Sequence, residues 1–102
     1  MERLHRVART LGNRHPEIES IYLFGSLARG DAVPGSDADL LIVVSHSADP
    51  FRDRSARFQT TGVGVGVDVV VYTREELDSM LETGNEFVRR ALREAILLIP
   101  VG

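Results

Sequence analysis

Residues 23–44, with the sequence LFGSLARGDAVPGSDADLLIVV, join two apolar runs through a polar connection rich in glycine, serine and aspartate. The first run, residues 18–24 (IESIYLF), contains many β-branched and aromatic residues and predicts a strand. Residues 37–44 (DADLLIVV) become apolar at consecutive positions, which is typical of a strand covered on both faces. If the two strands are antiparallel, the end of the first and the start of the second lie at the same edge of the sheet.

The polar connection predicts a turn followed by a short helix. Gly25 ends the first strand, and Ser26 is expected to cap a helix over residues 27–29, with Gly30 as its C-terminal stop. A glycine followed by a serine at a helix start presents free N–H groups and a hydroxyl, which together form an anion site. A purely structural turn is the alternative interpretation.

The rest of the chain predicts an α/β (α+β) fold, with a small mixed sheet of about four strands flanked by helices. Apolar residues recur with helical spacing over residues 2–14, and residues 63–72 alternate as a strand with glycines on one face. Thr73 and Glu76 form a capping box that opens a helix extending to about residue 82. The other predicted elements are a polar loop over 45–62 with one or two helical turns near 51–58, a helix over 85–93 and a strand over 95–99.

Composition limits the class of protein. The 102 residues predict one domain over residues 1–102, without a run apolar enough to span a membrane. The N-terminus lacks the apolar stretch of a signal peptide and the chain has no cysteine, so we expect a cytoplasmic protein without disulfides. A net charge of −3 gives no reason to expect direct nucleic-acid binding, and three arginines of the polar loop are predicted to be solvated: Arg52, Arg54 and Arg57. All twelve basic residues are arginines, which excludes a lysine-based phosphate site.

Three aspartates are candidates for a metal site. Asp37 and Asp39 are two positions apart on the second predicted strand, so their side chains project from the same face. Two carboxylates about 4 Å apart repel by roughly 4 kcal/mol at an effective dielectric constant of about 20, which favours a cation between them. Oxygen ligands suit Mg²⁺ or Mn²⁺ better than zinc, and Asp68 supplies a third carboxylate on the glycine face of its strand. Alternatively, Asp37 and Asp39 are ordinary turn and cap residues.

The spacing of these motifs resembles a known family. Gly25-Ser26, ten intervening residues and Asp37-x-Asp39 match the G-S-x(10)-D-x-D signature of the polymerase-β-like nucleotidyltransferase superfamily. The segment GSLARGDAVPGSDADL is similar to its minimal nucleotidyltransferase branch, and VDVVVYTREEL and NEFVRRALREAILLI resemble later parts of the family's domain. The resemblance implies the polymerase-β-like nucleotidyltransferase fold and the transfer of AMP from ATP with loss of pyrophosphate.

The resemblance also implies roles for individual residues. The implied catalytic and metal-binding residues are Asp37, Asp39 and Asp68. Together they would hold two Mg²⁺ ions, or Mn²⁺, and the third aspartate would help to deprotonate the acceptor hydroxyl. The implied nucleotide-binding residues are Gly25, Ser26, Arg29 and Ser36.

Three functions remain open at this point. Members of the minimal branch resemble antitoxins that attach AMP to a tyrosine of a HEPN-type ribonuclease, so we expect a protein adenylyltransferase of a toxin–antitoxin pair, in a homo- or hetero-oligomer. The catalytic domain of an aminoglycoside-type nucleotidyltransferase is an alternative, although 102 residues leave no separate acceptor-binding domain. A non-catalytic antitoxin module that binds its partner is the third, and the intact signature argues against it.

Overall fold

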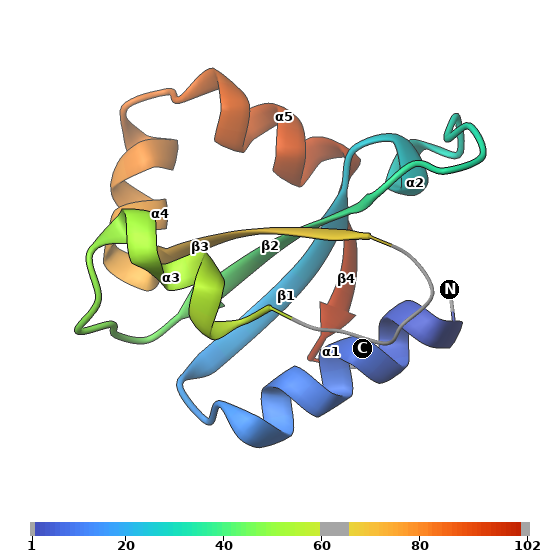
Figure 1. Cartoon of the computed structure of the whole chain (residues 1–102). Helices are drawn as coiled ribbons and strands as arrows, with labels where there is room; N and C mark the ends of the chain where they lie inside the picture. The colour runs from blue at the N-terminus through green and yellow to red at the C-terminus, as the bar shows by residue number, and fades with distance from the viewer. Residues whose placement is uncertain (1, 60–65, 101–102) are drawn as a thin grey trace.

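The computed structural model describes residues 2–59 and 66–100, which contain five helices and four strands (Figure 1). Their order is α1 (Glu2–Arg14), β1 (Ile18–Phe24), α2 (Ser26–Arg29), β2 (Ala38–Val44), α3 (Phe51–Arg57), β3 (Val67–Thr73), α4 (Arg74–Glu82), α5 (Glu86–Glu94) and β4 (Ile96–Ile99). The predicted α/β architecture with a four-stranded mixed sheet is confirmed. Within the described ranges, no helix has the length and apolar character needed to cross a membrane.

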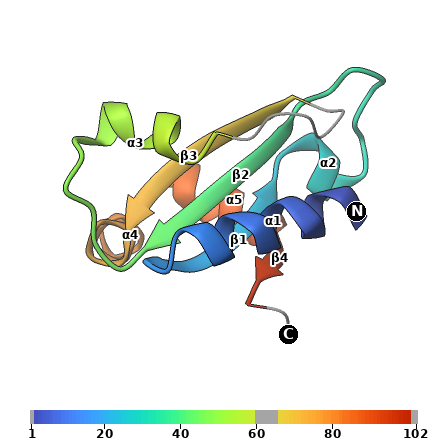
Figure 2. The ribbon, with the colours of Figure 1, turned by 60° about the horizontal axis from the view of Figure 1, so that its bottom comes forward.

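The sheet brings the ends of three strands to one edge. The strand order is β3-β2-β1-β4, with β1 antiparallel to β2 and β4, and β2 parallel to β3. The C-terminal end of β1 therefore lies beside the N-terminal ends of β2 and β3. The register at this edge pairs Phe24 with Asp39 and Asp39 with Asp68. Helix α3 lies in the crossover from β2 to β3, on the β3 side of the sheet (Figure 2).

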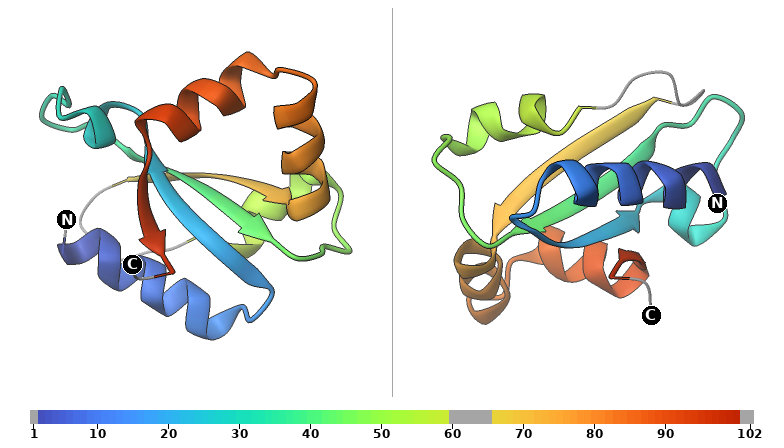
Figure 3. Two further views of the ribbon diagram at one scale, coloured as in Figure 1. Left: turned by 180° about the vertical axis from the view of Figure 1, so that it is seen from behind. Right: turned by 90° about the horizontal axis from the view of Figure 1, so that it is seen from below.

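Strand β2 anchors the core because its side chains are apolar on both faces. Leu40, Ile42 and Val44 pack with α1 on one side of the sheet, and Leu41 and Val43 pack with α4 and α5 on the other (Figures 1 and 3). All five side chains are fully buried. Burying a side chain of this size contributes roughly 1.5–3 kcal/mol, so this strand holds both helical layers against the sheet.

Two predicted boundaries near the polar connection need correction. Helix α2 begins at Ser26, with Gly25 at its N-cap and no side-chain capping bond, so the prediction that Ser26 caps the helix is wrong. Gly25 has φ 77°, a conformation that favours glycine, and it turns the chain into the helix one residue earlier than predicted. Asp37 lies just before the first residue of β2 and not within the strand. Gly30 adopts the left-handed conformation at the C-cap, as predicted.

The predicted polar loop contains a regular helix. The helical turns predicted near residues 51–58 are confirmed as α3. The prediction that Arg54 is solvated is wrong, because its side chain is only 8% exposed, whereas Arg57 and Arg52 are exposed. The part of the predicted third strand over residues 63–65 lies outside the described residues.

Arg54 connects α3 to the N-terminus of α4. Its guanidinium donates two hydrogen bonds to the carboxylate of Glu76, the longer one 3.1 Å, and its Nε donates to the carbonyl of Asp49 at 3.0 Å. Glu76 also accepts a hydrogen bond from the N–H of Thr73 at 2.9 Å, which completes the predicted capping box. One carboxylate therefore both caps α4 and holds α3 against it.

We expect Arg54→Met to lower the free energy of unfolding by about 1–3 kcal/mol, because Glu76 loses two charge-assisted hydrogen bonds. Arg57→Met, which removes an exposed pair with Asp49, is the control and should cost at most about 1 kcal/mol. The pKa of Glu76 is lowered chiefly by its hydrogen bond with Arg54. The stabilisation is therefore present above the unfolded-state pKa and is lost as the pH falls through the folded-state pKa. Chemical denaturation at neutral and acidic pH measures the effect, and an equal loss at both would contradict it.

Candidate active site

Asp39 and Asp68 lie side by side where β1 ends and β2 and β3 begin. They are register partners across the parallel β2–β3 pair, so their side chains project from the same face of the sheet. This is the face that α4 and α5 cover further along the strands. Asp37 and Asp68 are exposed, and Asp39 is half-buried. The structure thus brings the three predicted carboxylates to one edge, which we call the carboxylate edge (Asp37, Asp39 and Asp68).

Burial and charge repulsion both act on Asp39, the middle carboxylate. The pKa of Asp39 is raised, first because burial disfavours its charged form and then because Asp68 and Asp37 are negatively charged. The positive charge of Arg29 opposes this shift. A divalent cation at the carboxylate edge would relieve the same repulsion.

Two glycines allow the backbone to approach the carboxylates closely. A Cβ atom on Gly25 would overlap Oδ2 of Asp39, and a Cβ atom on Gly66 would overlap Oδ1 of Asp37. The carbonyl of Gly66 accepts a hydrogen bond from the N–H of Ala38 at 2.8 Å, which aligns the starts of β2 and β3. The space that these missing side chains leave is occupied by the carboxylates themselves.

The Gly25–Ser26 turn, where the sequence predicts an anion site, lies beside Asp39. The carbonyl of Gly25 accepts hydrogen bonds from the N–H groups of Ala28 and Arg29 at 3.1 and 3.0 Å, which forms the single turn of α2. As the first residues of this helix, Ser26 and Leu27 have no intrahelical acceptor for their N–H groups. These free N–H groups therefore follow directly after Gly25, whose backbone lies against the carboxylate of Asp39.

The other two predicted nucleotide contacts have different surroundings. Arg29 forms ion pairs with Asp31 at 3.1 Å and with Glu94 of α5 at 3.0 Å, which hold its guanidinium near Asp39. Figure 3 shows the corresponding corner, where α2 lies beside the end of α5. The hydroxyl of Ser36 accepts a hydrogen bond from the N–H of Val33 at 3.1 Å and closes the turn that precedes Asp37. Arg29 thus lies by the carboxylates, while the Ser36 hydroxyl is used within its own turn.

The donor set fits Mg²⁺ bound together with a phosphate ligand. Among the described residues, no three His, Asp or Glu side chains are gathered into a ready-made metal site. Mg²⁺ usually takes one or two carboxylates, several waters and substrate phosphates, so it does not need a closed protein site. The oxygen donors, their mutual repulsion and the adjacent free N–H groups of α2 agree with this mode of binding.

Sequence reasoning missed two residues that shape the site. Gly66 belongs to the predicted glycine face, but its contact with Asp37 was not foreseen. Glu94 holds Arg29 from 65 residues away and carries no local signal. Its role depends on where the end of α5 lies, which only the folded chain reveals.

Comparisons with known proteins identify the domain family and fold. A family model described as a nucleotidyltransferase domain matches residues 4–98. A search of curated proteins gives no match. Among solved structures, a Sulfolobus solfataricus protein provisionally identified as a nucleotidyltransferase has a TM-score of 0.64 and 26% sequence identity, over 94% of this chain and 76% of that chain.

Two further solved structures are more distant in sequence and similar in fold. A toxin–antitoxin complex with AMP-PNP has a TM-score of 0.62 and 18% identity, over 92% of this chain and 71% of that one. The mutant toxin–antitoxin complex MntA–HpeT, with two Asp-to-Glu substitutions two positions apart, has a TM-score of 0.61 and 16% identity, with the same coverage of 92% and 71%.

We expect Gly25→Ala to lower the free energy of unfolding by roughly 1–3 kcal/mol, because the new Cβ adds backbone strain and overlaps Asp39. Gly12→Ala is the matched control: a Cβ there meets nothing within 4 Å, and the change should stabilise α1 by roughly 0.5–1 kcal/mol. Urea denaturation of both variants measures the difference. If the two substitutions had the same effect, the close approach of Gly25 to Asp39 would be refuted.

Asp39→Asn should raise the thermal midpoint of the metal-free protein at pH 7. The raised pKa of Asp39 means that ionisation is less favourable in the folded state than in the unfolded state. The gain should therefore disappear below the unfolded pKa of about 3.9, where aspartate is protonated in both states. Thermal melts in chelator at pH 7 and at low pH test this, with the exposed Asp53→Asn in α3 as control. A lower midpoint at pH 7 would mean that Asp39 is a structural cap.

Proposed function

Because the chain belongs to the nucleotidyltransferase domain family, we propose that it transfers AMP from ATP to a hydroxyl group of a partner protein. One observation carries this proposal: Asp39 and Asp68 are register partners, and Asp39 lies against Gly25 at the start of the anion site. Metal-binding oxygens and phosphate-binding N–H groups are thus adjacent, as a metal–triphosphate complex requires.

The carboxylate edge and the Gly25–Ser26 turn have different roles in this reaction. The N–H groups of the turn bind the triphosphate, and Arg29 adds positive charge beside them. The carboxylates would hold two Mg²⁺ or Mn²⁺ ions, whose charge would stabilise the oxygens of an in-line displacement. Asp68 accepts the proton of the acceptor hydroxyl. The hydroxyl oxygen bonds to the α-phosphorus, the bond from that phosphorus to the bridging oxygen breaks, and pyrophosphate leaves.

The structural neighbours support a protein as the acceptor. Two of them are toxin–antitoxin complexes, and one of these contains the ATP analogue AMP-PNP. The two Asp-to-Glu substitutions in MntA–HpeT have the same spacing as Asp37 and Asp39. We infer that the acceptor is a tyrosine hydroxyl of a HEPN-type partner in a toxin–antitoxin pair.

Intact-mass spectrometry tests the proposed reaction. With Mg²⁺ and ATP, the protein encoded in the neighbouring reading frame should gain the mass of one AMP unit, and a chelator should prevent this. Asp39→Asn and Asp68→Asn should each slow transfer at least about 100-fold, because each removes a carboxylate that would hold the cations which stabilise the transition state. Asp53→Asn is the control and should keep the wild-type rate.

Two outcomes would contradict the proposal in different ways. Transfer to an aminoglycoside with none to the partner would overturn the protein acceptor and leave the nucleotidyl transfer intact. Unchanged transfer in both aspartate variants would overturn the assignment of the carboxylate edge.

A further inference from the structure

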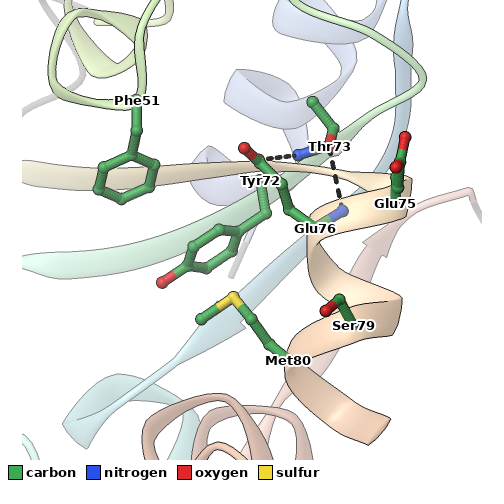
Figure 4. Close-up of a pocket in the computed structure, with 7 residues that line it drawn as sticks. All are labelled: Phe51, Tyr72, Thr73, Glu75, Glu76, Ser79 and Met80. Carbon is green, nitrogen blue, oxygen red and sulfur yellow. Dashed lines mark hydrogen bonds between the residues drawn. The ribbon is translucent and has the colours of Figure 1, made fainter. Parts of the chain in front are cut away.

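A recess lies at the opposite end of β3 from the carboxylate edge (Figure 4). Its volume is about 710 Å³. Phe51 of α3, Tyr72 of β3 and Met80 of α4 form its apolar part, and Glu75 and Ser79 of α4 form its polar side. We call it the α3–α4 pocket.

The aromatic side chains of the α3–α4 pocket are held in fixed positions. The ring of Phe51 stacks on the ring of Tyr72, with centroids 5.4 Å apart and planes at 20°. The guanidinium of Arg54 lies 5.9 Å from the centre of the Phe51 ring and is itself bound to Glu76. Phe51 nevertheless remains 51% exposed. A large aromatic side chain that is both ordered and exposed is typical of a binding surface.

The charge of the α3–α4 pocket favours a cationic ligand. The carboxylate of Glu76 is neutralised by Arg54. Glu75 is exposed and, within the described part of the chain, forms no ion pair. A ligand with a guanidinium or ammonium group could pair with Glu75 while its apolar part contacts Tyr72 and Met80.

The pocket and the carboxylate edge share one face of one strand. Asp68, Val70 and Tyr72 alternate along β3 and therefore project from the same side of the sheet. Tyr72 is four residues from Asp68, which corresponds to roughly 13 Å along the strand. An extended segment of about four residues could therefore reach from the pocket to Asp68.

We propose that the α3–α4 pocket binds the acceptor protein, through a segment that combines an arginine or lysine with an adjacent apolar side chain. This inference rests on the proposed function, because the bound segment would place an acceptor hydroxyl near Asp68. The anion site at the Gly25–Ser26 turn holds the nucleotide, and the pocket holds the protein substrate.

The side-chain methyl group of Met80 gives an NMR signal that reports ligand binding in the α3–α4 pocket. The chain has two methionines, so ¹³C-methyl labelling gives one signal in the pocket and one at Met1 as an internal reference. The probe is the peptide acetyl-Arg-Leu-Tyr-amide, compared with acetyl-Glu-Leu-Tyr-amide and with adenosine. We expect the arginine peptide alone to shift the Met80 signal, with a dissociation constant in the millimolar range.

Substitutions assign the contacts. Glu75→Gln should weaken binding of the arginine peptide at least about threefold, and Phe51→Leu at least about tenfold, whereas Glu82→Gln, which changes a carboxylate at the far end of α4, should have no effect. Phe51→Leu keeps an apolar side chain, and a thermal melt verifies that it folds.

Several results would overturn this inference without touching the nucleotide site. Equal binding of both peptides would exclude recognition of a cation, and a Met80 shift with adenosine alone would make the pocket a nucleoside site. Absence of any shift would exclude both. Calorimetry of Mg²⁺–ATP binding separates the two proposals: Glu75→Gln should retain wild-type ATP affinity. If the wild-type protein binds the arginine peptide but not Mg²⁺–ATP, the proposed nucleotidyl transfer is contradicted, whereas the proposed binding of a cationic segment in the α3–α4 pocket stands.

Discussion

Strand β2 combines a fully buried apolar segment with a carboxylate at its start, within seven residues. Five consecutive apolar side chains are fully buried, while Asp39 at its start is a carboxylate whose ionisation is disfavoured by burial and by neighbouring charge. The buried part fixes the strand between both helical layers, so that the charged end is held where β1 and β3 also meet. The position of the site therefore follows from core packing, and the local contact with Gly25 refines it.

The sequence predicts best those features that depend on neighbouring residues. The bounds of α1 and β1 agree with the prediction, because helical spacing and β-branched composition are local signals. The antiparallel β1–β2 pair is only a condition of the sequence-based prediction, because a connection of this length that contains a helix could also join parallel strands. The pairing of Asp39 with Asp68 could only be expected in outline, because the register of a parallel pair depends on a crossover and not on a turn.

Long-range ion pairs explain two of the features that the sequence did not predict. Arg54 and Arg57 lie on the same short helix, yet only Arg54 is buried. Its partner Glu76 is 22 residues away, so no local sequence signal predicts the pair. The pairing of Arg29 with Glu94 is equally non-local. In each case the sequence shows that the arginine is charged, but it does not show which carboxylate the arginine pairs with. These pairs connect separate elements: Arg54–Glu76 joins α3 to α4, and Arg29–Glu94 joins α2 to α5.

The parallel register of β2 and β3 links ligand binding to strand pairing. A slip of one residue would turn Asp68 toward the face covered by α1, away from Asp39. A ligand held by both aspartates binds only the paired state, so it opposes detachment of β3 by mass action. Since β3 is the outer strand on its side of the sheet, it opens more readily than β2. The lifetime of a ligand at this edge can therefore be no longer than the time for which the outer strand stays paired.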